Sequence, residues 1–284
     1  MNINKWKWRL VFVLALLNFV VCYFVYTGTQ DGNLEVSFLN VGQGDSIFIE
    51  SPNGNQMLID GGDVHGGILR RLSERMPFYD KFIDVVIATH PDKDHIGGLV
   101  DVLKNFQVGI VLDNGLFGGG DAYDEVERII REKKIKNIVA RRGQKIILDE
   151  GVTFTILFPD RDVTGVEDNT ASIIGRLVYG DHEFLLTADA PDEIEKYLVQ
   201  IDGKNLESDV LKAGHHGSKT STSEEFLGYV SPKYVVISSG EDNSYGHPHK
   251  DVILRLARFE TIVLRTDELG TITFISNGRE LEIK

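Results

Sequence analysis

The most informative segment of the chain is the loop His90-Pro91-Asp92-Lys93-Asp94-His95. The β-branched run before it, Ile83–Thr89, predicts a buried strand, and the pattern after it predicts a helix over Ile96–Phe106. Four side chains able to bind a metal fall within these six residues, in a loop that can turn them toward one point. Imidazole and carboxylate are common ligands of a hydrolytic divalent metal. Since a polar turn before a helix uses the same residue types, the loop indicates a metal site only together with the rest of the chain.

Aspartate and histidine recur where other predicted strands end. These residues are Asp60 after Leu58-Ile59, Asp189 after Leu185–Ala188, His215 and His216 after the strand ending at Lys212, and His247 after the strand ending at Ser238. Loops at strand ends are where active sites gather. The chain therefore predicts a metal-dependent active site assembled from several loops.

The composition excludes several classes of protein. Of 284 residues, 42% are hydrophobic and 26% charged, which excludes disordered, collagen-like and coiled-coil chains. The formal net charge is −13, and because the first 30 residues contribute +3, the remainder carries −16. A body this acidic does not hold nucleic acid by bulk electrostatics, which needs a basic face.

The front of the chain predicts a membrane anchor. An apolar run over Leu10–Tyr26, broken only by Asn18, approaches the roughly 17–25 residues that span a bilayer. Amphipathic aromatics, which prefer the membrane interface, stand at its two ends: Trp6, Trp8, Tyr23 and Tyr26. The alternative is a cleaved signal peptide, but the run is long and no good cleavage site follows it. Lipid attachment at Cys22, the only cysteine, is a further alternative, but the small residue expected directly before such a cysteine is absent.

Basic residues lie only before the apolar run, at Lys5, Lys7 and Arg9. The positive-inside tendency then places residues 1–9 in the cytoplasm, residues 10–26 in the cell membrane as a single span, and the body outside the cytoplasm.

The body reads as short strands interleaved with helices. Strands are expected at 34–41, 46–50, 56–59, 83–89, 108–112, 145–148, 153–158, 172–178, 183–187, 209–212, 234–238, 261–264, 271–275 and 280–283. Helices are expected at 67–76, 96–106, 122–134, 192–200, 223–229 and 250–258. Two mixed sheets packed face to face with helices outside account for this α/β pattern.

Four phrases of the sequence resemble a known family. They are Phe38–Ser46, His90–Gly98, Lys212–Lys219 and Tyr245–His249. Together they resemble the metallo-β-lactamase superfamily, and more closely the hydrolase domain of the ComEC DNA-uptake proteins. The resemblance covers residues 34 to about 275 and implies an αββα sandwich over 34–284 that binds one or two divalent metal ions. One anchor cannot form a pore, so it implies a stand-alone relative of that domain.

Carried over to this chain, the resemblance implies two metal positions that share Asp189. The first takes His90, Asp92 and Asn169, and the second takes Asp94, His95 and one of His215 or His216. The family loop has histidine where this chain has Asp92, and Asn169 stands where a later histidine is expected. This oxygen-rich ligation favours Mn²⁺ or Mg²⁺ more than a three-histidine set does, so zinc is not expected in both positions; the expected ions are Mn²⁺ or Zn²⁺, with Mg²⁺ as a further candidate. A single-metal enzyme or a lapsed site remains an alternative.

The remaining functional residues are expected around the metals. Asp60 supports the metal loop from behind, Asp94 orients the nucleophile, and His247 stabilises charge on the substrate. A helix after Ser218 and Lys219, with capping-box spacing from Ser221 to Glu224, suits either a bound phosphate or plain capping. The expected reaction is hydrolysis of a phosphodiester such as DNA. Alternatives are a small ester, lactam or phospholipid head group as substrate, or a non-catalytic tethered binding module.

Overall fold

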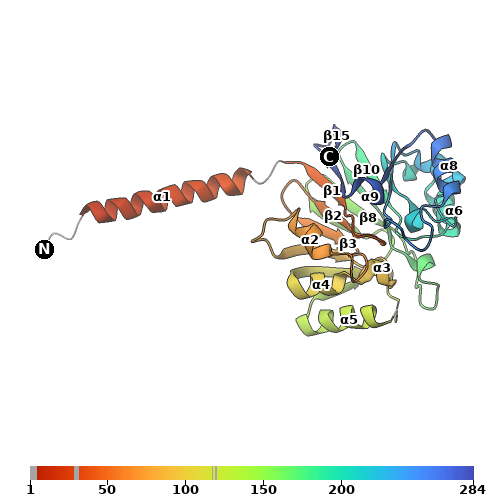
Figure 1. Ribbon diagram of the computed structural model, residues 1–284, viewed down its shortest axis with the longest axis horizontal. Helices are drawn as coiled ribbons and strands as arrows, with labels where there is room; N and C mark the ends of the chain where they lie inside the picture. The colour runs from red at the N-terminus through yellow and green to blue at the C-terminus, as the bar shows by residue number, and fades with distance from the viewer. Residues whose placement is uncertain (1–4, 29–31, 117, 119) are drawn as a thin grey trace.

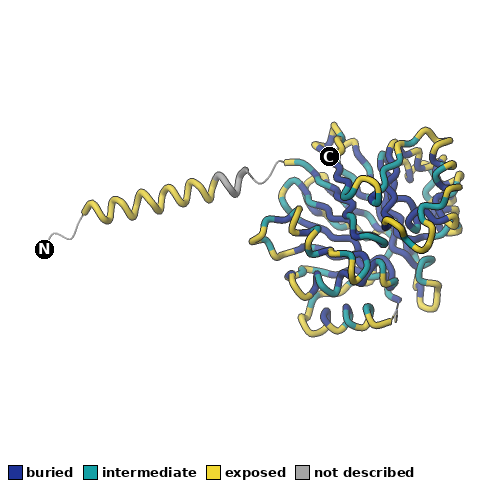
Figure 2. Tube along the Cα trace, in the orientation of Figure 1, coloured by how far each residue is buried: buried dark blue, intermediate teal, exposed yellow. Residues whose placement is uncertain are grey.

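The N-terminal segment forms one helix, α1 (Lys5–Gly28), which is separate from the rest of the chain (Figure 1). The computed structural model of the protein describes residues 5–28, 32–116, 118 and 120–284, and only the backbone of 24–28. The side chain of Tyr26 and residues 1–4 therefore lie outside the described part. From Lys5 to Tyr23, α1 is long and apolar enough to cross a membrane, and it buries nothing against the body (Figure 2).

The body is built on two mixed sheets. In spatial order, the first sheet contains β15 (Leu281–Ile283), β14 (Ile272–Ser276), β1 (Leu34–Phe38), β2 (Ile47–Glu50), β3 (Gln56–Ile59), β4 (Phe82–Ile87), β5 (Gln107–Asp113) and β6 (Lys136–Val139). The second contains β13 (Ile262–Arg265), β12 (Tyr234–Ile237), β11 (Val210–Lys212), β10 (His182–Leu186), β9 (Ile174–Tyr179), β8 (Val152–Phe158) and β7 (Lys145–Asp149). The pairs from β3 to β6 and from β10 to β13 are parallel.

Side-chain alternation along the strands separates two apolar layers on each sheet. Ile47 and Ile49 of β2 point into the core between the sheets, where Phe154 and Phe274 also lie, whereas Phe48 points outward. The outer face of the first sheet is covered by α2 (Ile68–Ser73), α4 (Leu99–Asn105) and α5 (Asp121–Lys133). The outer face of the second is covered by α6 (Asp192–Asp202), α7 (Glu224–Val230) and α8 (Lys250–Arg258) (Figure 1). The predicted αββα sandwich is confirmed.

The sequence-based boundaries differ from the structure at several elements, the following three among them. The single helix expected over Ile96–Phe106 is two helices, α3 (Lys93–Ile96) and α4, separated at Gly97-Gly98. The Gly98 N–H donates to the Gly62 carbonyl oxygen at 2.8 Å and the Asp94 carbonyl oxygen accepts from the Asp45 N–H, so the helical hydrogen-bond pattern is interrupted there. A Cβ on Gly98 would also lie 2.1 Å from the Gly61 carbonyl oxygen, which explains why glycine stands at this position. The strand expected over 34–41 ends at Phe38, and β6 was not expected because three of its four residues are exposed.

Strands β1, β3, β4, β10, β11 and β12 all run toward the same end of the sandwich. We call this the site end, because the loops carrying His90, Asp189 and His216 leave the sheets there. The opposite end, where β1 and β4 begin, is called the base. The short α9 (Thr266–Leu269) follows β13 at the site end.

Candidate metal centre

In the loop after β4, one ring nitrogen of His90 forms a hydrogen bond and the other has no hydrogen-bond partner. The Thr89 hydroxyl donates to Asp60 Oδ2 at 2.6 Å, so its oxygen accepts from His90 Nδ1, 2.9 Å away. His90 Nε2 is buried without a hydrogen-bond partner and lies 3.6 Å from Asp92 Oδ2. This tautomer leaves the Nε2 lone pair available to a metal.

His95 is oriented in the same way by Asp60. Its Nδ1 donates to Asp60 Oδ2 at 2.8 Å, and its Nε2 lies 3.3 Å from Asp189 Oδ2. The side chains of His95 and Asp60 are fully buried, and His95 Nε2 has no hydrogen-bond partner. A carboxylate behind a ligating histidine fixes the ring and raises its basicity. The geometry agrees with the supporting position expected for Asp60.

The second sheet supplies the facing side of the cluster. His216 Nδ1 donates to the Ser238 carbonyl oxygen at 2.9 Å, while its Nε2 lies 3.3 Å from Asp189 Oδ2 and 3.4 Å from Asp94 Oδ2. His215 Nε2 lies 3.6 Å from the same Asp189 oxygen, but its side chain is 29% exposed. Of the two histidines that the sequence left open, His216 belongs to the buried cluster and His215 lies at its mouth.

The cluster has the donor set of a metal site. Among the described residues, possible ligand atoms lie within 4.8 Å of one another in four groups: His90, His95 and Asp189; Asp94, His95 and His216; Asp45, Asp189 and His216; and Asp45, Asp60 and His95. Three imidazole Nε2 atoms are buried there without hydrogen-bond partners, as is Asp189 Oδ1. Buried polar atoms are rarely left unpaired, so a bound cation explains this arrangement best. The residues present therefore fit the divalent metal ions that the sequence implied.

Backbone strain accompanies the cluster. Asp60, Ala188, His215 and His216 all have positive φ, from 45° to 58°, which is uncommon for residues other than glycine. Gly44 brings its loop against the metal loop, where a Cβ would lie 1.9 Å from the Asp94 carbonyl oxygen. Strain of this kind persists at functional sites where the surrounding structure enforces it.

Sequence reasoning missed two residues of the cluster, Asp45 and Lys212. Lys212 is fully buried at the end of β11, and its Nζ lies 2.5 Å from Asp45 Oδ2 and 3.5 Å from Asp189 Oδ1. It also donates to the Ala188 carbonyl oxygen at 2.8 Å. Both residues stand inside the phrases that carry the family resemblance, which was the one available signal.

Charges in the cluster shift several pKa values. Burial opposes the imidazolium form of His95, but Asp189 and Asp60 outweigh it and hold the His95 pKa well above its usual value. Burial likewise opposes the charged form of Asp94, yet His216 and His95 lower the Asp94 pKa to about 2. Asp94 and Asp189 are therefore anionic at neutral pH, and without a metal the buried imidazoles of His95 and His216 retain protons that a metal must displace.

The other expected residues lie around this centre. Burial of His247, together with the neighbouring His216 and His215, lowers the His247 pKa to about 4, so its ring is neutral at neutral pH. The His247 ring centroid lies 5.5 Å from that of His215. Asn169 lies in a 3₁₀ turn (Asn169–Ala171), and its Oδ1 is buried without a hydrogen-bond partner. Ser172, just after that turn, places its Oγ 3.5 Å from His90 Nδ1.

The expected capping box is wrong. Ser223, not Ser221, caps α7 and accepts from the Phe226 N–H. The carboxylate of Glu195, from α6, accepts the N–H groups of Thr222 and Ser223 at 2.5 and 2.8 Å. Backbone donors expected to hold a phosphate are therefore already occupied. Ser218 hydrogen-bonds to Thr220, and Lys219 is exposed.

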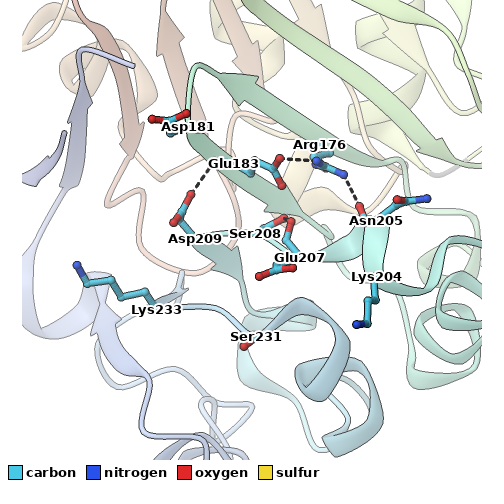
Figure 3. Close-up of a pocket in the computed structure, with 10 residues that line it drawn as sticks. All are labelled: Arg176, Asp181, Glu183, Lys204, Asn205, Glu207, Ser208, Asp209, Ser231 and Lys233. Atoms are coloured by element: carbon cyan, nitrogen blue, oxygen red, sulfur yellow. Dashed lines mark hydrogen bonds and ion pairs between the residues drawn. The ribbon is translucent and has the colours of Figure 1, made fainter. Parts of the chain in front are cut away.

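A polar cleft of about 370 Å³ lies at the base, far along the strands from this cluster (Figure 3). Arg176 pairs there with Glu183, and Asp209 accepts the Glu183 N–H at 2.9 Å. None of the expected site residues lines it.

Comparison with known proteins agrees with this geometry. The family model described as the metallo-beta-lactamase superfamily matches residues 39–241. ComE operon protein 3 of Bacillus subtilis is 33% identical over 266 residues, which cover 86% of this chain and 33% of the relative. Competence protein ComA of Neisseria gonorrhoeae is 34% identical over 266 residues, or 92% of this chain and 35% of the relative. The chain thus spans about a third of the length of these relatives.

Solved structures share the fold at low sequence identity. The metallo-beta-lactamase fold protein YhfI from Bacillus subtilis superposes with a TM-score of 0.58 at 13% identity, covering 86% of this chain and 100% of YhfI. CmlA, a diiron β-hydroxylase from Streptomyces venezuelae, gives a TM-score of 0.55 at 13% identity, covering 84% of this chain and 53% of CmlA.

Proposed function

The chain belongs to the metallo-beta-lactamase superfamily, and from that premise we propose that it is a membrane-anchored, metal-dependent hydrolase of phosphodiester bonds. The observation that carries the proposal is the buried set of unpartnered imidazole nitrogens around Asp189. A divalent ion held there would lower the pKa of a bound water and polarise the bond under attack.

We carry the ligands over from the family resemblance, and the positions of the buried unpartnered atoms support part of this set. His90, Asp92, Asn169 and Asp189 would hold one ion, and Asp94, His95, Asp189 and His216 the other. The assignment of His216 rests on its Nε2 lying within 3.4 Å of both Asp94 and Asp189. The ions are Mn²⁺ or Zn²⁺, with Mg²⁺ as a further candidate at the oxygen-rich position.

The protein's own residues prepare the reaction. Asp60 fixes the orientation of His95, and Lys212 balances the charge of Asp189 from behind the cluster. Asp94, half-exposed at the front, would orient the attacking nucleophile. His247, neutral at neutral pH, would hydrogen-bond to the substrate beside His215 at the mouth of the cluster.

DNA is the phosphodiester that the relatives favour. One of them is named as a competence protein, ComA of Neisseria gonorrhoeae, and another, from Haemophilus influenzae, is named Recombination protein 2. The charge of −16 on the body argues against extended binding along a duplex. Ions at the cluster would instead neutralise the scissile phosphate locally, as at other metal-dependent phosphodiesterases.

The proposal also includes a membrane anchor at the N-terminus. Helix α1 would span the membrane once, with Lys5, Lys7 and Arg9 on the cytoplasmic side and residues 34–284 outside the cytoplasm. Protease added to intact cells should digest the body and leave the N-terminus protected. Resistance of the body until the cells are opened would contradict the orientation.

The activity is tested with the full chain in detergent, loaded with Mn²⁺ or Zn²⁺. Single-stranded DNA, a chromogenic phosphodiester and a β-lactam are offered in parallel. We expect the two phosphodiesters to be cleaved and Asp94→Ala to abolish cleavage while circular dichroism stays unchanged. Asp121→Ala, a carboxylate exposed on α5, is the matched control and should retain activity. Cleavage of the β-lactam alone, or full activity of Asp94→Ala, would refute the proposal.

A further inference from the structure

Three aromatic side chains are exposed in one short loop at the base. Phe78 is 88% exposed and Tyr79 60% in the loop between α2 and β4, and Phe82, at the start of β4, is 44% exposed. The rings of Phe78 and Tyr79 pack edge to face with centroids 5.4 Å apart. A cleft of about 100 Å³ adjoins them; its apolar lining residues are Leu69, Leu72, Met76, Pro77, Phe78 and Phe106, and Ser73, Asp80, Lys81 and Asn105 line it as well. Exposed apolar surface of this kind marks an interaction site.

The loop lies at the end of the body where the chain arrives from α1. Strand β1 begins at Leu34, and its second residue, Glu35, pairs with Glu50 at the end of β2. Glu50 pairs in turn with Gln56, whose Nε2 donates to Asp80 Oδ2 at 2.9 Å. Because neighbouring strands lie about 4.8 Å apart, three spacings place the start of β4 about 15 Å from that of β1.

The sequence limits how far this end can be from a membrane. Five residues separate Gly28, the last of α1, from Leu34. Six extended peptide steps reach at most about 20 Å. If α1 spans a bilayer, the base is therefore held within about that distance of its surface, and the site end, at the far ends of the same strands, faces away from it.

We propose that the Phe78–Tyr79 tip inserts into the interface of the lipid bilayer and holds the base against the membrane. Tyrosine suits this position because its apolar ring ends in a polar hydroxyl that fits the head-group region, and the phenylalanine ring adds apolar area beside it. The acidic side chains behind the tip, Glu35 and Glu50, argue against attraction by anionic lipid, so insertion depends on the aromatic rings. The metal cluster then opens toward the aqueous side. The inference rests on the proposed anchor.

The test uses the full chain in phosphatidylcholine liposomes that contain no other protein. In a Cys22→Ser background, Phe78→Cys is labelled with an environment-sensitive fluorophore, and Leu269→Cys serves as the matched control. Leu269 is 58% exposed on α9 at the site end, and neither substitution removes a buried side chain. We expect the label at Phe78 to emit at shorter wavelength than the one at Leu269 and to lose intensity when doxyl-labelled lipid is included.

Flotation of the same liposomes separates the two proposals. Protein that floats with lipid while its Phe78 label stays as water-exposed as the Leu269 label would overturn the insertion and leave the anchor standing. Protein that fails to float would overturn both. Loss of the shift in the Tyr79→Ser, Phe82→Ser background would support insertion through the aromatic rings, whereas a shift that survives there would show that the fluorophore itself enters the lipid and would overturn the insertion.

Discussion

Replacing Lys212 with methionine should destabilise the protein strongly. Methionine has a similar volume, so the change removes the ammonium without opening a large cavity. Lys212 is fully buried, with its Nζ 2.5 Å from Asp45 Oδ2 and 3.5 Å from Asp189 Oδ1. Two buried carboxylates would then lose their lysine partner.

The magnitude follows from these distances. At an effective dielectric constant of about 20, the two attractions amount to roughly 7 and 5 kcal/mol before desolvation. Desolvation of the ammonium, several kcal/mol, offsets much of this gain. Breaking one side of a buried pair therefore costs about 3–5 kcal/mol, against a total stability of about 5–15 kcal/mol for an ordinary domain.

Chemical denaturation of the full chain, followed by circular dichroism in the presence of a chelator, measures this loss. Lys196→Met is the matched control, because its ammonium pairs with Asp192 on the exposed face of α6 at 2.6 Å and should cost less than about 1 kcal/mol. Added metal should reduce the loss in Lys212→Met, since a cation beside Asp189 replaces the missing charge. An equal loss of stability in the two variants, or an unfolding free energy of Lys212→Met that does not change with added metal, would refute the charge-balancing role of Lys212.

Three further outcomes are expected. Asp92→His should raise the affinity for Zn²⁺ relative to Mn²⁺ in competition titrations, because imidazole suits zinc better than carboxylate does; an unchanged ratio would show that Asp92 binds no metal. Metal affinity measured by calorimetry should fall as the pH is lowered, beginning above pH 6.5, because protons compete with the metal for His95 and His216. Burial opposes protonation of these two histidines, but the surrounding carboxylates raise both pKa values. An affinity that stays constant down to pH 6 would contradict this. Burial and the nearby Glu35 raise the Glu50 pKa from 4.5 to about 7, so the native state binds a proton more tightly than the unfolded state and the stability falls as the pH rises between these values. Glu50→Gln should therefore be more stable than the wild type at pH 8, by roughly 1–2 kcal/mol after allowance for partial exposure, and equally stable at pH 4. An equal difference in stability at both pH values would exclude titration of Glu50.

The sandwich and much of the candidate centre could be predicted from the sequence because their signals are local. Apolar runs with period two marked the strands, and potential ligands followed directly at strand ends, as in His90–His95. Parallel strands bring their carboxyl ends to one edge, so residues distant in sequence, such as Asp189, could be placed near the loop.

The features that were missed depend on contacts between distant segments. Lys212 reads as a polar residue ending a strand, and only packing of the two sheets shows that Asp45 makes it a buried cation. The choice of His216 over His215 depends on the Ser238 carbonyl oxygen, on a strand that follows later in the chain. The helix α7 itself was expected nearly in place, but its cap was misassigned to Ser221, because the carboxylate of Glu195, from another helix, holds the N–H groups of Thr222 and Ser223.

The proposed function requires that the buried cluster around Asp189 binds metal. Elemental analysis of the purified full chain, dialysed after loading with Mn²⁺ or Zn²⁺, tests it most directly. We predict one to two divalent ions per chain in the wild type and a loss of at least one in Asp189→Ala. A wild-type protein that retains no ion under any loading condition, with its fold intact by circular dichroism, would contradict the claim.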